Sequence, residues 1–161
     1  ALPIWTPTEE QGPGVYAFAL RVTDDGTPPR STSQRVTVTV NEINRPPVLP
    51  AIASRTVDEG SLLSIDARAN DPDVPANALA YGLAQGAPSG AKIDPATGLF
   101  TWTPSEIQGP GVYPITITVS DNGVPALTDA RSFVVTVREV NNPPVFDPVG
   151  AQTTEIGRAH V

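Results

Sequence analysis

Hydrophobic and polar residues alternate along much of this chain, with the two-residue period of half-buried β-strands. In residues 112–120 the apolar side chains Tyr113, Ile115, Ile117 and Val119 share one face, and proline and threonine occupy the other. Residues 61–69 and 133–137 repeat this period, and residues 79–83 and 99–103 are short apolar runs. The tripeptides Asp24-Asp25-Gly26 and Asp121-Asn122-Gly123 favour hairpin turns. The pattern predicts an all-β, antiparallel β-sandwich without a convincing helix.

The chain contains an internal repeat. Residues 5–48 align without a gap with residues 102–145, at an offset of 97 residues, and 22 of the 44 positions are identical. A period near 97 residues suits a small sandwich domain better than a solenoid unit. We therefore divide the chain into the C-terminal part of one repeat (1–44), a complete repeat (45–141) and the start of a third (142–154). Pro-Pro pairs at 46–47 and 143–144 should stiffen the links between tandem repeats.

The last seven residues are interpreted separately. Residues 155–161, EIGRAHV, resemble the translation of a common sequencing adapter, so we expect read-through of a short DNA insert. The alternative is a native strand in which Gly157 corresponds to Gly60. His160, the only histidine, lies in this adapter-like segment, so we do not expect it to act as a ligand or a base. The chain contains no methionine, and we expect it to be a piece of a longer protein.

Charge and composition exclude several functions. The chain carries 17 acidic and 10 basic residues, a net charge of −7, so it should repel nucleic acids. It contains no cysteine and no histidine outside the adapter-like segment, which removes disulfides, thiol chemistry and histidine-based catalysis. A carboxylate pair for glycoside hydrolysis stays open, although the acidic residues fall in predicted turns and linkers. We therefore expect no enzyme.

Ordered motifs across the complete repeat resemble a known family. They are NRPPV, VDEGSLLSI, ANDPD, APSGAKIDPATGLFTWTP, GVYPITITVSDNG and NNPPVF. Together they make residues 44–141 similar to a cadherin-like repeat, in particular the dystroglycan-type or "putative Ig" repeats of bacterial surface proteins. The resemblance implies a seven-stranded, Ig-like Greek-key sandwich, used in tandem at the bacterial cell surface or in secreted proteins. It also implies a non-catalytic adhesion or structural role, with neighbouring repeats, surface proteins or glycans as partners.

The resemblance further implies calcium as a cofactor. In cadherins, Ca²⁺ is held at each junction by carboxylates of two successive domains and by their linker, and this ion prefers six to eight oxygen ligands. Matched to the family motifs, the candidate ligands are Asp71, Asp73, Asp121, Glu42, Asn44, Glu59, Glu139 and Asn141.

The chain also departs from the cadherin pattern. Its linker is one residue shorter, and Arg45 stands near a position where cadherins place an acid. The Asp-Arg-Glu ligand motif is reduced to Glu9 and Glu106. We therefore expect incomplete ion occupancy, with Arg45 weakening the site. A Kd of about 10⁻⁴–10⁻³ M is typical of extracellular modules.

Each candidate also has a plainer interpretation. Asp71, Asp73 and Asp121 are ordinary turn residues, and the glutamates could be solvated charges. Trp5 and Trp102 are expected in the core, whereas an exposed aromatic platform would indicate a carbohydrate-binding accessory module of an extracellular hydrolase. Residues 1–44 hold only the last strands of a sandwich, so their apolar face should lack an opposing sheet.

Overall fold

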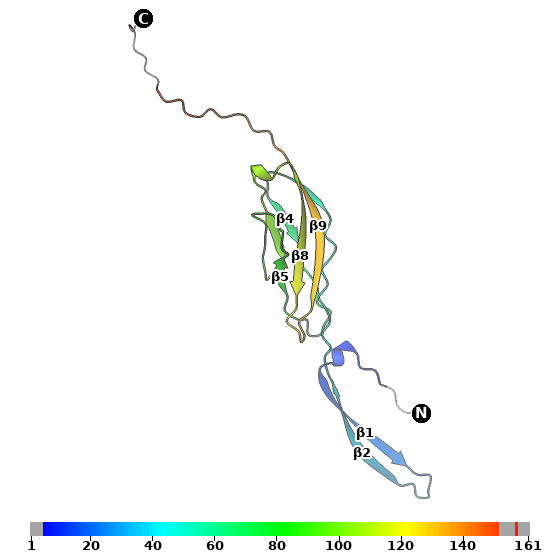
Figure 1. Cartoon of the computed structure of the whole chain (residues 1–161). Coiled ribbons are helices and arrows are strands. Elements are labelled where there is room, and N and C mark those ends of the chain that lie inside the picture. Colours follow the sequence, from blue (N-terminus) through cyan, green and yellow to red (C-terminus); the bar gives the residue numbers. More distant parts are fainter. Residues whose placement is uncertain (1–4, 152–156, 158–161) are drawn as a thin grey trace.

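The complete repeat is a two-layer β-sandwich in a computed structural model that describes residues 5–151 and residue 157. One sheet has the strand order β3 (Arg55–Asp58), β9 (Thr128–Arg138), β8 (Gly111–Ser120) and β5 (Ala80–Leu83). The other has the order β4 (Leu63–Asp66), β7 (Leu99–Trp102) and β6 (Lys92–Ile93). Neighbouring strands are antiparallel except β3 and β9, which are parallel. The seven strands confirm the predicted sandwich (Figure 1).

The apolar faces of the two sheets form the core. In β8, Ile115, Ile117 and Val119 are buried, as the alternating pattern predicts. Phe100 of β7 meets Phe133 of β9 edge to face at 5.7 Å between ring centroids, which joins the two sheets. Leu49, just after the first linker, is buried in the core. Its backbone N–H donates a hydrogen bond to Asp129 Oδ2 at 2.9 Å. The linker is thus fixed to the sandwich that follows it.

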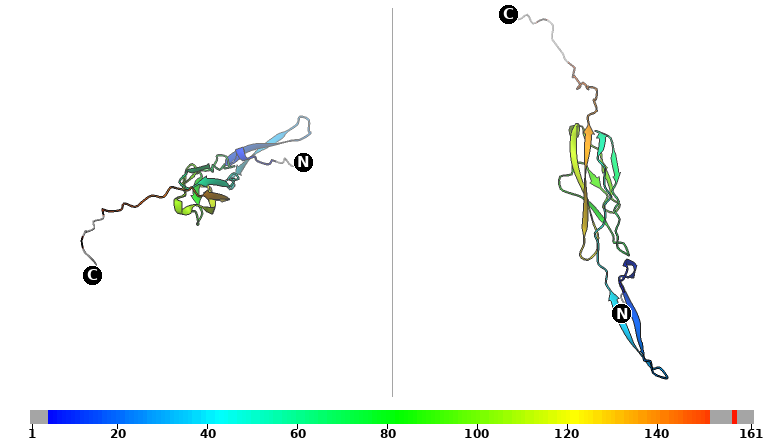
Figure 2. Two further views of the ribbon diagram at one scale, coloured as in Figure 1. Left: turned by 90° about the horizontal axis from the view of Figure 1, so that it is seen from above. Right: turned by 90° about the vertical axis from the view of Figure 1, so that its right-hand side faces the viewer.

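The strands within residues 5–44 form a single hairpin rather than a sandwich. Strands β1 (Gly14–Thr23) and β2 (Ser31–Val40) pair antiparallel and extend away from the complete repeat in every view (Figures 1 and 2). Leu20 is 50% exposed and Phe18 is 41% exposed, because no second sheet covers them. The expectation of an uncovered apolar face is confirmed.

Several short elements are absent from the sequence prediction. Strands β3 and β6 and the single-turn 3₁₀ helices η1 (Glu9–Gln11) and η2 (Glu106–Gln108) are too short to show a period. The predicted strand 61–69 is shorter in the structure, where β4 covers residues 63–66. Residues 152–154 of the third repeat and the adapter-like segment with His160 lie outside the described residues, apart from Gly157. No helix in the described part of the chain is long and apolar enough to cross a bilayer.

Candidate metal centres at the two ends of the repeat

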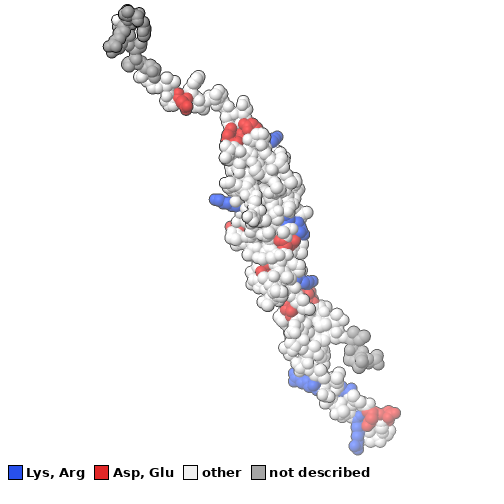
Figure 3. Space-filling view, viewed as in Figure 1, with Lys and Arg blue, Asp and Glu red and all other residues white. Residues whose placement is uncertain are grey.

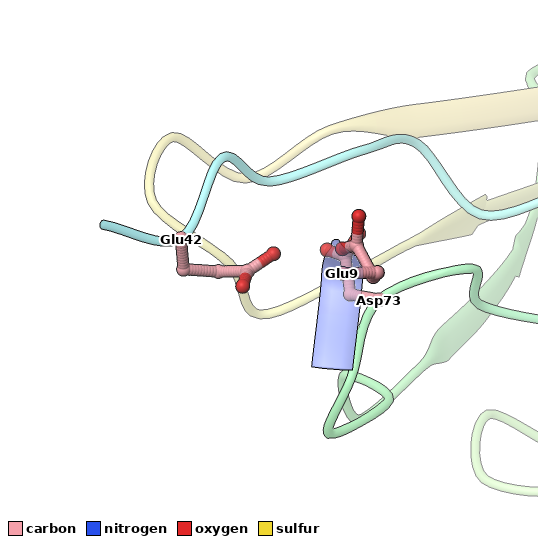
Figure 4. A group of neighbouring side chains, drawn as sticks. All are labelled: Glu9, Glu42 and Asp73. Atoms are coloured by element: carbon pink, nitrogen blue, oxygen red, sulfur yellow. The ribbon is translucent and has the colours of Figure 1, made fainter. Parts of the chain in front are cut away.

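Three carboxylates from separate segments meet where the hairpin joins the sandwich. Glu9 lies in η1, Glu42 follows β2, and Asp73 lies in the loop between β4 and β5. Each offers an oxygen within 4.8 Å of the other two, and Figure 4 shows the three side chains converging. We call Glu9, Glu42 and Asp73 the N-terminal acidic cluster. Two of its members belong to the first repeat and one to the second, so the cluster spans the junction.

The side chain of Arg45 reaches into this cluster. Its Nη2 donates to Glu9 Oε2 at 2.6 Å, and its Nε lies 3.4 Å from Asp73 Oδ1. The backbone N–H of Arg45 donates to Asp73 Oδ2 at 3.1 Å. Burial, followed by the negative charge of Glu9, raises the pKa of Glu42, and the positive charge of Arg45 only partly opposes this rise. The cluster therefore retains an excess of negative charge.

An amide network extends the N-terminal cluster across the end of the sandwich that faces the hairpin. Asn77 Nδ2 donates to Asn44 Oδ1 at 2.8 Å and to Asp73 Oδ2 at 2.9 Å. Asn44 Nδ2 donates in turn to Asp121 Oδ2 at 3.2 Å. Asp71 Oδ1 accepts the N–H groups of Asp73 and Asn77, while Asp71 Oδ2 is buried without a hydrogen-bond partner. Four candidate ligands, Asp71, Asp73, Asp121 and Asn44, thus lie in one network.

Turn formation accounts for part of this arrangement. Asp121 Oδ1 accepts the backbone N–H groups of Gly123 at 3.0 Å and Leu127 at 2.9 Å. Burial tends to raise the pKa of Asp121, but these two donors and Asn44 outweigh it and lower the pKa. A Cβ at Gly123 would overlap the amide of Asn44, so the glycine admits the linker against the turn. The predicted turn role of Asp71 and Asp121 is confirmed, and it is compatible with ion binding.

A second acidic cluster lies at the opposite end of the sandwich. Glu59 follows β3, Glu106 begins η2 and Glu139 follows β9; their carboxylate oxygens lie within 4.8 Å of one another. We call these residues the C-terminal acidic cluster. Figure 3 shows acidic side chains gathered at the end of the sandwich from which the C-terminal tail leaves. Both ends of the complete repeat therefore carry converging carboxylates.

Glu59 is the most deeply placed member of the C-terminal cluster. It is only 6% exposed; its Oε1 accepts the backbone N–H of Val140 at 3.1 Å, and its Oε2 is buried without a hydrogen-bond partner. A Cβ at Gly109 would overlap Oε2, so the glycine leaves room for this carboxylate. Burial and then the charges of Glu59 and Glu106 raise the pKa of Glu139. A buried carboxylate oxygen without a donor is costly unless a proton or a cation neutralises it.

The predicted ligands separate into two groups, with one exception. Glu42, Asn44, Asp71, Asp73 and Asp121 meet at the N-terminal end, and Glu59 and Glu139 meet at the C-terminal end. Asn141, in the second linker, is exposed. Glu9, Glu106 and Asn77 were not among the predicted ligands. The signal that could have identified Glu9 and Glu106 is their match to the reduced Asp-Arg-Glu ligand motif, at equivalent positions of the two repeats.

The aromatic residues give no support to a sugar platform. Trp102 is 1% exposed and Tyr81 is 8% exposed, so both belong to the core, as expected for Trp102. Trp5 was also expected in a core, but it is 36% exposed. It packs edge to face on Tyr16 and Phe18 within its own hairpin. The difference from Trp102 arises because the hairpin has no opposing sheet.

Comparison with protein families finds one family model that matches most of the complete repeat. The model described as Putative Ig domain matches residues 46–138. Among curated proteins, Protein dachsous of Drosophila melanogaster is 34% identical over 145 residues, which is 82% of this chain and 4% of dachsous. Protocadherin-16 of Homo sapiens is 36% identical over 142 residues, which is 83% of this chain and 4% of that protein. The chain therefore spans only a small fraction of these relatives.

Solved structures resemble the chain across the junction as well as within the repeat. The Protocadherin GammaB4 extracellular domain matches with a TM-score of 0.60 and 26% identity, over 81% of this chain and 23% of that one. A Protocadherin gammaB7 fragment, described as a cis-dimer, matches with a TM-score of 0.60 and 25% identity, over 81% of this chain and 33% of that one. These matches are longer than the complete repeat alone and include part of the preceding hairpin.

Proposed function

Because the chain belongs to the Putative Ig domain family and is built as a cadherin-like repeat, we propose that it is a calcium-binding structural module. In this proposal Ca²⁺ binds where successive repeats join and stiffens the tandem array. The relatives with 34% and 36% identity are named as dachsous and a protocadherin, which supports an adhesion or structural module rather than an enzyme.

The observation that carries the proposal is the unpartnered Oε2 of Glu59. Bringing three carboxylates together costs free energy through mutual repulsion and desolvation. Among the described residues, no ion pair involves Glu59, Glu106 or Glu139, so no side-chain cation neutralises the C-terminal cluster. Ca²⁺ accepts carboxylate oxygens in flexible geometry. It would remove the repulsion and supply the missing partner of Oε2.

The C-terminal cluster fits calcium better than it fits a soft metal. Its donors are hard carboxylate oxygens, and the chain contains no cysteine. Glu59, Glu106 and Glu139 would hold the ion. In a tandem protein the next repeat would add the equivalents of Asp71 and Asp73, because those residues occupy the facing end of the complete repeat. Asn141 in the linker is a further candidate donor.

The N-terminal network is the second proposed ion position. Its ligands would be Asp71, Asp73, Asp121, Glu42 and Asn44, as the family resemblance implies. Asp71 Oδ2 is buried without a hydrogen-bond partner and is the oxygen most available to an ion. The other carboxylate oxygens of Asp71, Asp73 and Asp121 already accept protein donors. This position is therefore proposed to bind Ca²⁺ more weakly.

Location and partners follow from the same proposal. The cadherin-type relatives of the chain favour an extracellular or cell-surface module. We place the chain in a secreted or surface protein, with attachment to a bacterial surface as the specific form. Neighbouring repeats of the same chain are its first partners, because the Arg45–Glu9 ion pair already connects two repeats. Surface proteins or glycans are the proposed external partners.

Thermal unfolding in chelator and in Ca²⁺ tests the proposal. With a Kd of about 10⁻⁴–10⁻³ M, Ca²⁺ at ten to a hundred times Kd should stabilise the fold by about 1.4–2.7 kcal/mol. That corresponds to a rise of several degrees in Tm. Glu59→Gln keeps the oxygen that accepts the Val140 N–H and removes the negative charge, so it should abolish most of the rise.

Two comparisons complete this experiment. Glu10→Gln removes an equal charge from an exposed residue outside both clusters and should retain the full Ca²⁺ effect. The double substitution Asp71→Asn, Asp73→Asn should remove only the contribution of the N-terminal network. If Ca²⁺ leaves the melting curve of each of the four proteins unchanged, these acidic residues do not bind the ion, and the proposal is refuted.

A further inference from the structure

The two acidic clusters share two equivalent glutamates, and their third members, Asp73 and Glu59, differ. By the 97-residue offset, Glu9 corresponds to Glu106 and Glu42 corresponds to Glu139. The residue after each linker asparagine differs, however: it is Arg45 at the first junction and Asn142 at the second. A charged side chain therefore occupies one junction, and a neutral side chain occupies the other.

Both side chains contact the equivalent carboxylate. Arg45 Nη2 donates to Glu9 Oε2 at 2.6 Å, and Asn142 Nδ2 donates to Glu106 Oε2 at 3.1 Å. The backbone therefore directs the side chain at this position to the same atom in both repeats. What changes between the junctions is the charge delivered there, not the direction of the side chain.

Arg45 is held in its cluster by more than one bond. Its Nε lies 3.4 Å from Asp73 Oδ1, its backbone N–H donates to Asp73 Oδ2, and its Nη2 also donates to the carbonyl of Pro72. The Asp73 side chain is only 2% exposed, so the guanidinium compensates a buried carboxylate. A guanidinium presents several donors in a rigid plane and stays charged at any physiological pH. It can therefore act as a permanent, covalently attached cation.

We propose that Arg45 is the resident cation of the N-terminal acidic cluster, so that the guanidinium holds this junction together and Ca²⁺ binds there only weakly, whereas the C-terminal cluster requires the ion. This inference rests on the proposed function and deepens it. The stiffness of a tandem array then depends on calcium at some junctions and not at others. The residue that follows the linker asparagine decides which kind of junction forms.

Ion access does not account for the difference between the junctions. Glu9, Glu42 and Arg45 all line an open hollow of about 430 Å³ beside the first linker. A hydrated cation can therefore reach the N-terminal cluster. Competition with the guanidinium for Glu9 and Asp73 is what should weaken Ca²⁺ binding there, since the guanidinium already contacts both carboxylates.

Amide resonances of two equivalent glycines can follow the two clusters separately. A Cβ at Gly12 would lie 3.3 Å from Glu42 Oε2, and a Cβ at Gly109 would overlap Glu59 Oε2. We suggest ¹⁵N-labelled full chain titrated with CaCl₂. In the wild type, Gly109 should shift with a midpoint of about 10⁻⁴–10⁻³ M. Gly12 should not shift over this range.

Reciprocal substitutions test the role of the differing position. Arg45→Asn gives the first junction the residue of the second, and Gly12 should then titrate in the same range as Gly109. Asn142→Arg should weaken the response of Gly109 by about tenfold or more, because a cation now contacts Glu106. Arg35→Asn removes an equal charge from an exposed position in β2 and should leave both responses unchanged.

The outcomes separate the inference from the proposed function. Equal responses of Gly12 and Gly109 in the wild type, unchanged by Arg45→Asn, would overturn the inference while supporting calcium binding. A response of Gly12 in Arg45→Asn without any response of Gly109 would support the role of Arg45 at the first junction but overturn the statement that the C-terminal cluster requires an ion. If neither glycine responds in any variant, both are overturned.

Discussion

Replacing Trp102 with alanine removes the largest fully buried side chain of the complete repeat, so its cost can be worked out from the structure. The indole is 1% exposed and meets the ring of Tyr113 edge to face at 5.1 Å. Truncation of a buried Trp to Ala costs about 3–5 kcal/mol through lost burial and the cavity that remains. An aromatic pair contributes about 0.5–1.5 kcal/mol beyond burial, and the loss of this pair is part of the cost of the truncation.

The polar contact of Trp102 adds little to this cost. Its Nε1 donates to the carbonyl of Ser89 at 3.1 Å, but Gln108 Nε2 donates to the same oxygen at 3.2 Å. The carbonyl therefore keeps a partner after truncation, and no penalty for an unsatisfied buried acceptor is expected. We expect a loss of about 3–5 kcal/mol in the free energy of unfolding. Since 1 kcal/mol shifts Tm by about 4–8 °C in a domain of this size, Tm should fall by more than about 12 °C.

Urea denaturation followed by far-ultraviolet circular dichroism measures this loss, and Trp5→Ala is the matched control. Trp5 occupies the equivalent position by the 97-residue offset and also packs on two aromatic rings, but it is 36% exposed in a hairpin without an opposing sheet. Its truncation should leave the main transition unchanged. A loss below about 1 kcal/mol for Trp102→Ala would refute the assignment of Trp102 to the core. Loss of glycan binding in the same variant would favour the carbohydrate-binding alternative.

Three further predictions concern the linker, the charge of the second junction and the hairpin. Asp129→Ala should cost about 1–3 kcal/mol in a urea titration, because the buried N–H of Leu49 loses its acceptor, whereas Asp129→Asn keeps an acceptor oxygen and should cost less. The folded-state pKa of Glu139 is raised, so its ionised form opposes folding at neutral pH and the cost is relieved as the pH falls through that pKa. Glu139→Gln should therefore raise Tm in chelator at pH 7, reduce the gain from Ca²⁺ and flatten this part of the pH profile; an unchanged Tm in both conditions would contradict the argument. Amides of residues 14–40 should exchange with deuterium much faster than those of β8 and β9, since an isolated two-stranded sheet is marginal in water; equal protection would show that the hairpin is stabilised in some other way.

The alternating pattern predicted the long strands because their burial has the same period. In β8, alternate residues from Tyr113 to Val119 pack into the core, and the register with β9 keeps them there. Strand β6 has only two residues, and β3 contains a single apolar residue, so neither shows an apolar run or a period. The position of β3 depends on pairing with β9, which lies far away in the sequence, and β6 is defined only by pairing with β7 across a short turn.

The candidate sites were predictable in their location but not in their internal contacts. Motif matching placed Asp71, Asp73 and Asp121 at one end of the repeat, and the structure brings them into one network. It gave Glu9 only as a remnant of the Asp-Arg-Glu motif and not as a ligand, because the closeness of Glu9 to Asp73 depends on how the two repeats meet. Arg45 was expected to weaken the site, but its contacts with two carboxylates emerge only from the folded junction. Local sequence identifies ligand types, whereas the pairing of charges depends on how consecutive repeats meet.

Isothermal titration calorimetry of Ca²⁺ into the full chain tests the central claim most directly. The account predicts saturable binding with a Kd of about 10⁻⁴–10⁻³ M in the wild type. This binding should persist in Glu10→Gln and be largely lost in Glu59→Gln, whose substituted side chain can still accept the Val140 N–H. Absence of saturable heat in the wild type, or the same isotherm for Glu59→Gln, would contradict the claim that Ca²⁺ neutralises the carboxylates at the C-terminal end of the repeat.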